Sequence, residues 1–146
     1  MSQRVFLLDK VKYGIMVPAH VLRPTDEEML ESTKIVQKFG SEPCYGDLAE
    51  NKIAMALATI GFKTARTFRG SVADVDYKWD VYIRTQKGVF GIQVKSSRNR
   101  SMEFVTTKNY RNTIVIWFNP KFKITDKELG EFLAKALATF GICPAS

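Results

Sequence analysis

The chain has 146 residues, of which 45% are hydrophobic and 25% are charged. This length fits one domain with a substantial core, and the composition excludes a mainly disordered protein. Cys44 and Cys143 have no CxxC partner, which argues against a zinc site and a disulfide framework. No apolar stretch approaches the roughly 18 residues that span a bilayer, and residues 1–10 lack the apolar region of a signal peptide. We therefore expect a soluble, intracellular protein with no membrane partner.

One or two short strands and two helices are predicted in the first part of the chain. Residues 4–8 and 13–17 have the composition of short strands. Residues 26–39 begin with acidic side chains and are followed by a glycine, as is typical of a helix. Residues 47–60 place apolar side chains on one stripe, which predicts a second helix. The stripe consists of Leu48, Ile53, Ala56, Leu57 and Ile60.

The rest of the chain predicts a sheet followed by a helix. Residues 63–68 form one expected strand, and residues 79–85 and 89–96 form a hairpin with a short turn. Residues 113–118 are almost continuously apolar, which is typical of a central strand that is buried on both faces. Residues 125–140 open with the capping-box pattern Thr-x-x-Glu and continue as an amphipathic helix. This order predicts an α/β protein with a mixed central β-sheet flanked by helices.

Polar side chains converge on one face of the expected hairpin. If residues 86 and 87 form the turn, Asp80 lies opposite Gln93, and if residues 87 and 88 form it, Asp80 lies opposite Lys95. Because side chains alternate along a strand, the three share a face in either register. A cross-strand ion pair between Asp80 and Lys95 would be the simplest interpretation. The other face is expected to be apolar core and carries Trp79, Val81, Ile83, Phe90, Ile92 and Val94.

Glu50 adds a second carboxylate. It precedes Ile53 and Leu57 by three and seven residues, so it projects from the apolar stripe of its helix toward the sheet. The spacing of Asp47 and Glu50 also fits a capping box, in which Glu50 would bind only a backbone N–H. Both interpretations remain open.

Positive charge gathers after the first strand of the hairpin. The net charge is +7, and between residues 84 and 123 nine Lys or Arg stand against one acid, Glu103. A local basic excess favours a polyanion such as nucleic acid, because bound phosphates release counterions. A solvated basic face is the alternative.

Three segments resemble the PD-(D/E)XK nuclease superfamily. The core of that superfamily has a Glu on a helix, an Asp on a strand and a (Glu or Gln)-x-Lys element on a strand. The corresponding segments here are Gly46-Asp-Leu-Ala-Glu50, Trp79-Asp80-Val81 and Gln93-Val94-Lys95. The match spans residues 46–120 and is similar to archaeal Holliday-junction resolvases and to intron-encoded endonucleases with Gln at this position. The resemblance implies a restriction-endonuclease-like three-layer core over residues 46–140 of a single domain. It leaves residues 1–45 as an N-terminal extension.

The resemblance also implies a site of four catalytic residues, Glu50, Asp80, Gln93 and Lys95. A Mg²⁺ or Mn²⁺ ion would be held by Asp80, the side-chain oxygen of Gln93 and the backbone carbonyl of Val94. Lys95 would orient the attacking water or stabilise transition-state charge, and Glu50 would act through a water or a second metal ion. Gln93 stands where most members have a carboxylate. This favours a single metal ion and leaves open a protein that binds nucleic acid without cleaving it.

The implied activity is hydrolysis of DNA phosphodiester bonds, in branched DNA or at a specific duplex site. A homodimer or a higher homo-oligomer is expected, because cutting two strands at symmetric positions needs two active sites. His20 and the loop residues Asp74 and Asp76 are given no catalytic role. Phosphate contacts are assigned to the polar and basic residues that follow the hairpin, namely Ser96, Ser97, Arg98, Arg100, Lys108 and Arg111.

Overall fold

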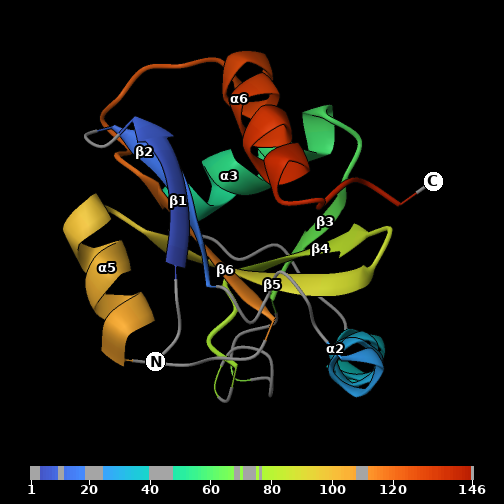
Figure 1. Ribbon diagram of the computed structural model, residues 1–146. Helices are drawn as coiled ribbons and strands as arrows, with labels where there is room; N and C mark the ends of the chain where they lie inside the picture. Colours follow the sequence, from blue (N-terminus) through green and yellow to red (C-terminus); the bar gives the residue numbers. More distant parts are fainter. Residues whose placement is uncertain are drawn as a thin grey trace.

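The computed structural model (Figure 1) describes residues 4–9, 12–18, 25–39, 48–67, 70, 75, 77–107 and 112–145. Within these residues, six strands form one mixed sheet in the order β1-β2-β6-β5-β4-β3. The strands are β1 (Arg4–Asp9), β2 (Tyr13–Pro18), β3 (Lys63–Arg66), β4 (Val81–Thr85), β5 (Gly88–Lys95) and β6 (Thr113–Phe118), and the helices are α2 (Asp26–Phe39), α3 (Leu48–Thr59), α5 (Arg98–Thr107) and α6 (Asp126–Thr139). The chain is therefore an α/β protein, as predicted. No helix within these segments is both long enough and apolar enough to cross a membrane.

Strand β6 is central, as its apolar sequence predicts. It pairs with β2 on one side and with β5 on the other, and every residue of it is buried. The pairing with β5 is parallel. Parallel neighbours need a crossover connection, and α5 provides it. No helix was predicted in this part of the chain.

Helices lie on both sides of the sheet. In Figure 1, α3 and α6 pack above it, whereas α2 and α5 lie on the other side. The largest apolar cluster lies under α3 and α6 and includes Ile53, Leu57, Ile83, Ile92, Ile116, Leu133 and Leu137. On the α5 side, Phe104 packs against Met16, Val115 and Trp117.

Trp79 lies on the opposite face from the one predicted. Its indole N–H donates to Thr113 Oγ1 at 3.0 Å, and the ring is fully buried in a cluster with Tyr77, Tyr82 and Val89. The alternation of side chains holds only within a regular strand. Here β4 begins at Val81, and Lys78 has a φ of 59°. The chain bends just before β4, and this bend places the Trp79 side chain on the opposite face of the sheet.

The N-terminal segment belongs to the sheet. Strands β1 and β2 form an antiparallel hairpin, and β2 continues the sheet by pairing Tyr13 with Phe118 of β6. The predicted strands at residues 4–8 and 13–17 are therefore confirmed. Their role in extending the sheet could not be inferred from the sequence.

The two helices above the sheet begin and end mostly as predicted. Thr125 caps α6, and its hydroxyl accepts the N–H of Glu128 at 3.1 Å. Helix α3 is followed by Gly61, which has a φ of +97°. Leu48, predicted on the buried stripe of α3, is 75% exposed, and Ala49 is buried in its place.

Gly130 lets α6 approach α3 closely. A Cβ at this position would lie 2.6 Å from the carbonyl oxygen of Ala56 and from Thr59 Oγ1. A Gly→Ala change inside a helix normally stabilises by about 1 kcal/mol. We expect Gly130→Ala instead to lower the free energy of unfolding by about 2 kcal/mol, because the helices must move apart. Urea unfolding measures this change, and a stabilised variant would contradict the close packing.

Candidate functional site

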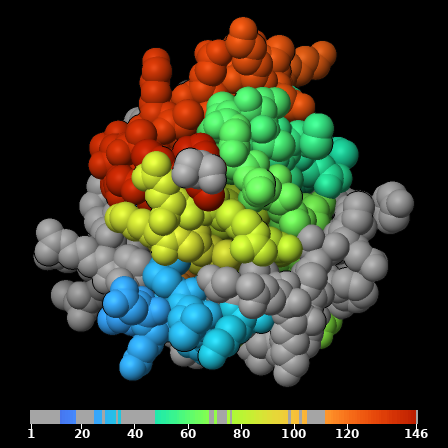
Figure 2. All heavy atoms as spheres, turned by 90° about the vertical axis from the view of Figure 1, so that its right-hand side faces the viewer, coloured from blue at the N-terminus to red at the C-terminus, as the bar shows by residue number. Residues whose placement is uncertain are grey.

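The β4–β5 hairpin has the first of the two registers that the sequence allows. Val81 pairs with Ile92 and Thr85 with Gly88, so Gln86 and Lys87 form the turn. The turn end is covered, because the Gln86 N–H donates to the Cys143 carbonyl at 3.0 Å. Figure 2 shows the hairpin (yellow) between α2 (blue) and the C-terminal segment (red). The predicted site lies at the opposite end of the hairpin.

Asp80 is fixed by backbone hydrogen bonds to two strands. Its carboxylate oxygen Oδ2 accepts the Val94 N–H at 2.8 Å, and its own N–H donates to the Ile92 carbonyl at 2.9 Å. Its carbonyl accepts the Thr67 N–H at 3.1 Å. The carboxylate therefore lies beside the β5 backbone between Gln93 and Lys95.

Gln93 presents a buried oxygen that lacks a partner. Its Oε1 is shielded from solvent and accepts no hydrogen bond, although burying such a group costs about 1–3 kcal/mol. Phe90, Ile92 and Val94 face the cluster under α3 and α6, so Gln93 faces the α5 side. A divalent cation bound to this oxygen would compensate the cost of burying it.

Oxygen ligands of this kind suit Mg²⁺ or Mn²⁺. The residues that would hold the ion are Asp80, Gln93 and Val94, the last through its backbone carbonyl. Within the described part of the chain, no group of three or more His, Cys, Asp or Glu side chains gathers. A centre with one carboxylate, one amide and one carbonyl would not form such a group. The residues present fit a single-metal centre.

Lys95 shares the α5 side of the sheet with Gln93. Its ammonium group lies 4.8 Å from the centre of the Phe104 ring, a cation–π contact between β5 and the crossover helix. The aromatic ring limits the positions that the amine can take. Lys95 is thus held near the end of β5, one residue beyond the backbone N–H that binds Asp80.

Glu50 reaches the sheet, as predicted, and meets a partner that the sequence did not indicate. Its carboxylate accepts a hydrogen bond from the Arg66 guanidinium and forms an ion pair with it. The Arg66 side chain is only 9% exposed and also donates to Asn51. The only sequence signal was a basic residue at the end of a short strand. Asp47, the other half of the possible capping box, lies outside the described residues.

Of the residues assigned to DNA contacts, Ser96, Ser97 and Arg100 lie where β5 passes into α5. The Ser97 hydroxyl accepts the Arg100 N–H at 3.2 Å and so caps the helix, while Ser96 and Arg100 are exposed. Other assigned or discussed positions lie outside the described residues, namely the side chain of Arg98 and residues His20, Cys44, Asp74, Asp76, Lys108 and Arg111.

One edge of the sheet brings these groups together. Strands β5 and β6 run parallel and end at this edge, β4 begins there and β3 ends there. Asp80, Lys95 and the Glu50–Arg66 pair therefore share one edge. In α/β sheets, ligands bind at the carboxyl ends of parallel strands. We call this the carboxyl edge.

Comparisons of this chain with protein-family models, with curated proteins and with solved structures give no match. The function is therefore inferred from the geometry of the carboxyl edge and from the sequence pattern that it contains.

Proposed function

We propose that this protein is a metal-dependent DNA endonuclease with a restriction-endonuclease-like core of the PD-(D/E)XK kind. One observation supports this most directly. The Asp80 carboxylate is fixed on the Val94 N–H at 2.8 Å, next to Gln93, whose buried Oε1 accepts no hydrogen bond. These are the positions at which the sequence motif expects a metal ion.

Each side chain has a distinct role in this proposal. Asp80, Gln93 and the Val94 carbonyl bind Mg²⁺ or Mn²⁺, which activates a water and polarises the scissile phosphate when bound. Lys95 supplies a positive charge where negative charge develops on the phosphate oxygens. Phe104 holds the lysine side chain and so positions that charge.

The pairing of Glu50 with Arg66 supports a one-metal centre. Arg66 compensates the charge of Glu50, so this carboxylate attracts a second cation less strongly. The same pairing favours a second candidate function, a protein that binds nucleic acid at the carboxyl edge without cleaving it.

DNA is the proposed partner because positive charge is concentrated in the part of the sequence that contains Lys95 and α5. Nine of the 22 Lys and Arg residues fall between residues 84 and 123, and the exposed Arg100 lies in the first turn of α5, the helix that follows β5. Phosphate contacts from such residues position DNA without reading its sequence. Branched DNA and a specific duplex site both remain candidate substrates. We propose a homodimer, which sedimentation velocity can measure directly.

Metal-dependent cleavage tests the proposal. Supercoiled plasmid and a synthetic four-way junction are incubated with the protein in Mg²⁺, in Mn²⁺ and in EDTA. We expect nicked or resolved products only with a divalent ion. Products in EDTA would contradict the metal site, and binding of both substrates without cleavage would favour the second candidate.

Lys95→Met removes the charge and retains an unbranched side chain that can pack on Phe104. We expect the cleavage rate to fall about a hundredfold, the usual effect of losing one group that stabilises transition-state charge. Lys135→Met, an exposed lysine of α6, is the matched control and should cleave normally. Equal rates for the two variants would remove Lys95 from the mechanism.

A further inference from the structure

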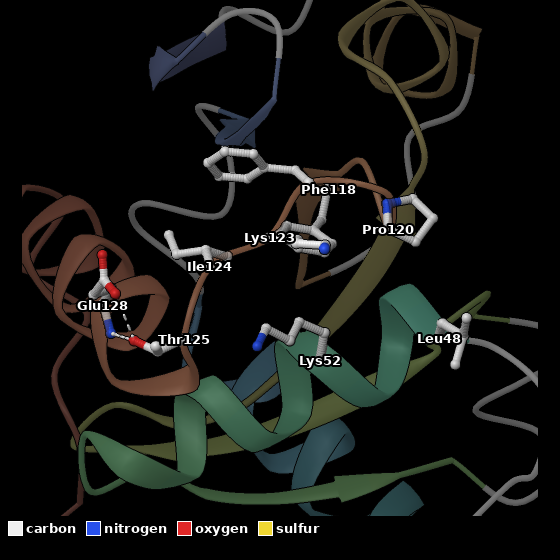
Figure 3. Close-up of a pocket in the computed structure, with 9 residues that line it drawn as sticks. Leu48, Lys52, Phe118, Pro120, Lys123, Ile124, Thr125 and Glu128 are labelled. Carbon is white, nitrogen blue, oxygen red and sulfur yellow. Dashed lines mark hydrogen bonds between the residues drawn. The ribbon is translucent and has the colours of Figure 1, made fainter.

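A pocket of about 580 Å³ lies on the α3–α6 side of the sheet. Leu48 and Lys52 of α3 form one wall, and the chain between β6 and α6 forms the other. Figure 3 shows Lys52 and Lys123 reaching from opposite sides into the space between the two walls. The volume is in the range of sites that hold one small molecule or one nucleotide.

The pocket opens at the carboxyl edge. Phe118, which lines it, is the last residue of β6, and the preceding Trp117 lies beside Lys95 in the parallel register. From ordinary strand spacings, the Cα atoms of Phe118 and Lys95 are roughly 6 Å apart. Phe118 faces the α3–α6 side of the sheet and Lys95 faces the α5 side, so the pocket and Lys95 lie on opposite faces at the same edge. A DNA strand that crosses the carboxyl edge would therefore pass both the pocket and Lys95.

The lining combines apolar walls with positive charge. Leu48, Pro120 and Ile124 provide the apolar surface that reaches solvent, which suits a flat apolar ligand such as a nucleobase. The Lys52 ammonium is held by Asp126 at 2.7 Å, whereas Lys123 is exposed at the pocket. A base between the walls with its phosphate near Lys123 would match both kinds of surface.

We propose that this pocket receives an unpaired nucleotide next to the scissile phosphate. The substrate class would then be DNA with an unpaired or extruded base, as at a branch point or a bulge, rather than continuous duplex. Extruding a base costs least where it is already unpaired. This inference rests on the proposed function, because the adjacent phosphate is the one at which Asp80 and Lys95 would act.

Binding in EDTA tests the pocket separately from catalysis. Fluorescence anisotropy compares a labelled duplex with one unpaired nucleotide against the same duplex fully paired. We expect the wild type to bind the bulged duplex about tenfold more tightly, a factor in the range that stacking of one base provides. We expect Lys123→Glu, and Leu48→Trp at the exposed rim, to abolish this preference.

Lys121→Glu is the matched control. It makes the same charge change at an exposed position two residues away that does not line the pocket. It should weaken binding of both duplexes equally and retain the preference for the bulge. Equal binding of the two duplexes by a wild type that cleaves DNA would overturn the pocket and leave the nuclease proposal intact. The pocket would also be overturned if Lys123→Glu and Leu48→Trp still bound the bulged duplex more tightly than the paired one. If both variants lost this preference but the wild type cleaved no DNA, the result would support the pocket and not the nuclease proposal.

Discussion

Asp80→Asn is expected to lower the rate of DNA cleavage about a thousandfold while leaving the fold and DNA binding in place. Asparagine has nearly the same shape as aspartate, and its oxygen can still accept the Val94 N–H that Asp80 now binds at 2.8 Å. The negative charge is lost, and one carboxylate oxygen becomes an amide NH₂. Because Asp80 is the single carboxylate among the three proposed ligands, its charge contributes most of the attraction for Mg²⁺.

Two further variants separate the role of this charge from the role of the hydrogen bond. Asp80→Ala removes the acceptor as well and leaves the Val94 N–H without it, so it should also lower the free energy of unfolding by about 1–3 kcal/mol. Glu131→Gln removes a negative charge from an exposed position on α6 and should not change the rate. Gel assays of plasmid nicking and urea unfolding measure both effects. An Asp80→Asn variant that cleaves like wild type would show that the metal site is wrongly assigned.

Gly91→Ala is expected to lower the free energy of unfolding by about 3 kcal/mol, at the upper end of the usual cost of overpacking. The Trp79 indole fills the space where a side chain at position 91 would stand, so an added Cβ would overlap the ring. The ring cannot simply move aside, since it is fully buried and hydrogen-bonded to Thr113. Urea unfolding measures the loss.

A double-mutant cycle with Trp79→Phe tests whether this clash is the cause. Trp79→Phe alone should destabilise, because it leaves space and removes the hydrogen bond to Thr113. Combined with Gly91→Ala, the smaller ring relieves the overlap, and the double variant should be more stable than the sum of the two changes by at least about 1 kcal/mol. Strict additivity would show that Trp79 does not occupy the space above Gly91.

Much of the fold could be predicted because local patterns agree with the tertiary structure. Helix α2 occupies residues Asp26–Phe39, within the range expected from its acidic start and the following glycine. The continuous apolar sequence of β6 identified a strand that is buried along its whole length. The two possible positions of the turn gave two possible registers for the β4–β5 hairpin, and one of them is observed.

The parts that could not be predicted depend on long-range packing. Helix α5 has a polar sequence with β-branched residues near its end, and tertiary packing of Phe104 is its clearest contact with the core. The helix is implied only once β5 and β6 are known to be parallel. The partner of Glu50 was missed for a related reason, because Arg66 meets it only when α3 folds onto β3.

The orientation of Trp79 was wrong because a rule for regular strands was applied beyond the end of one. The left-handed backbone at Lys78 depends on the surrounding structure, and no sequence pattern there marks it. Asp80 follows this bend, and its carboxylate binds the Val94 N–H at the end of the hairpin. The alternation of side chains along a strand could therefore not predict the position of the Asp80 carboxylate.

The central position of β6 has a consequence for how the molecule folds. Its two neighbours are β5, reached through a helical crossover, and β2, which lies about a hundred residues earlier in the chain. Such distant pairings slow folding into the range of milliseconds to seconds. The carboxyl edge exists only when β6 has joined β5, so DNA binding should be recovered in the slowest refolding phase rather than with the early helices.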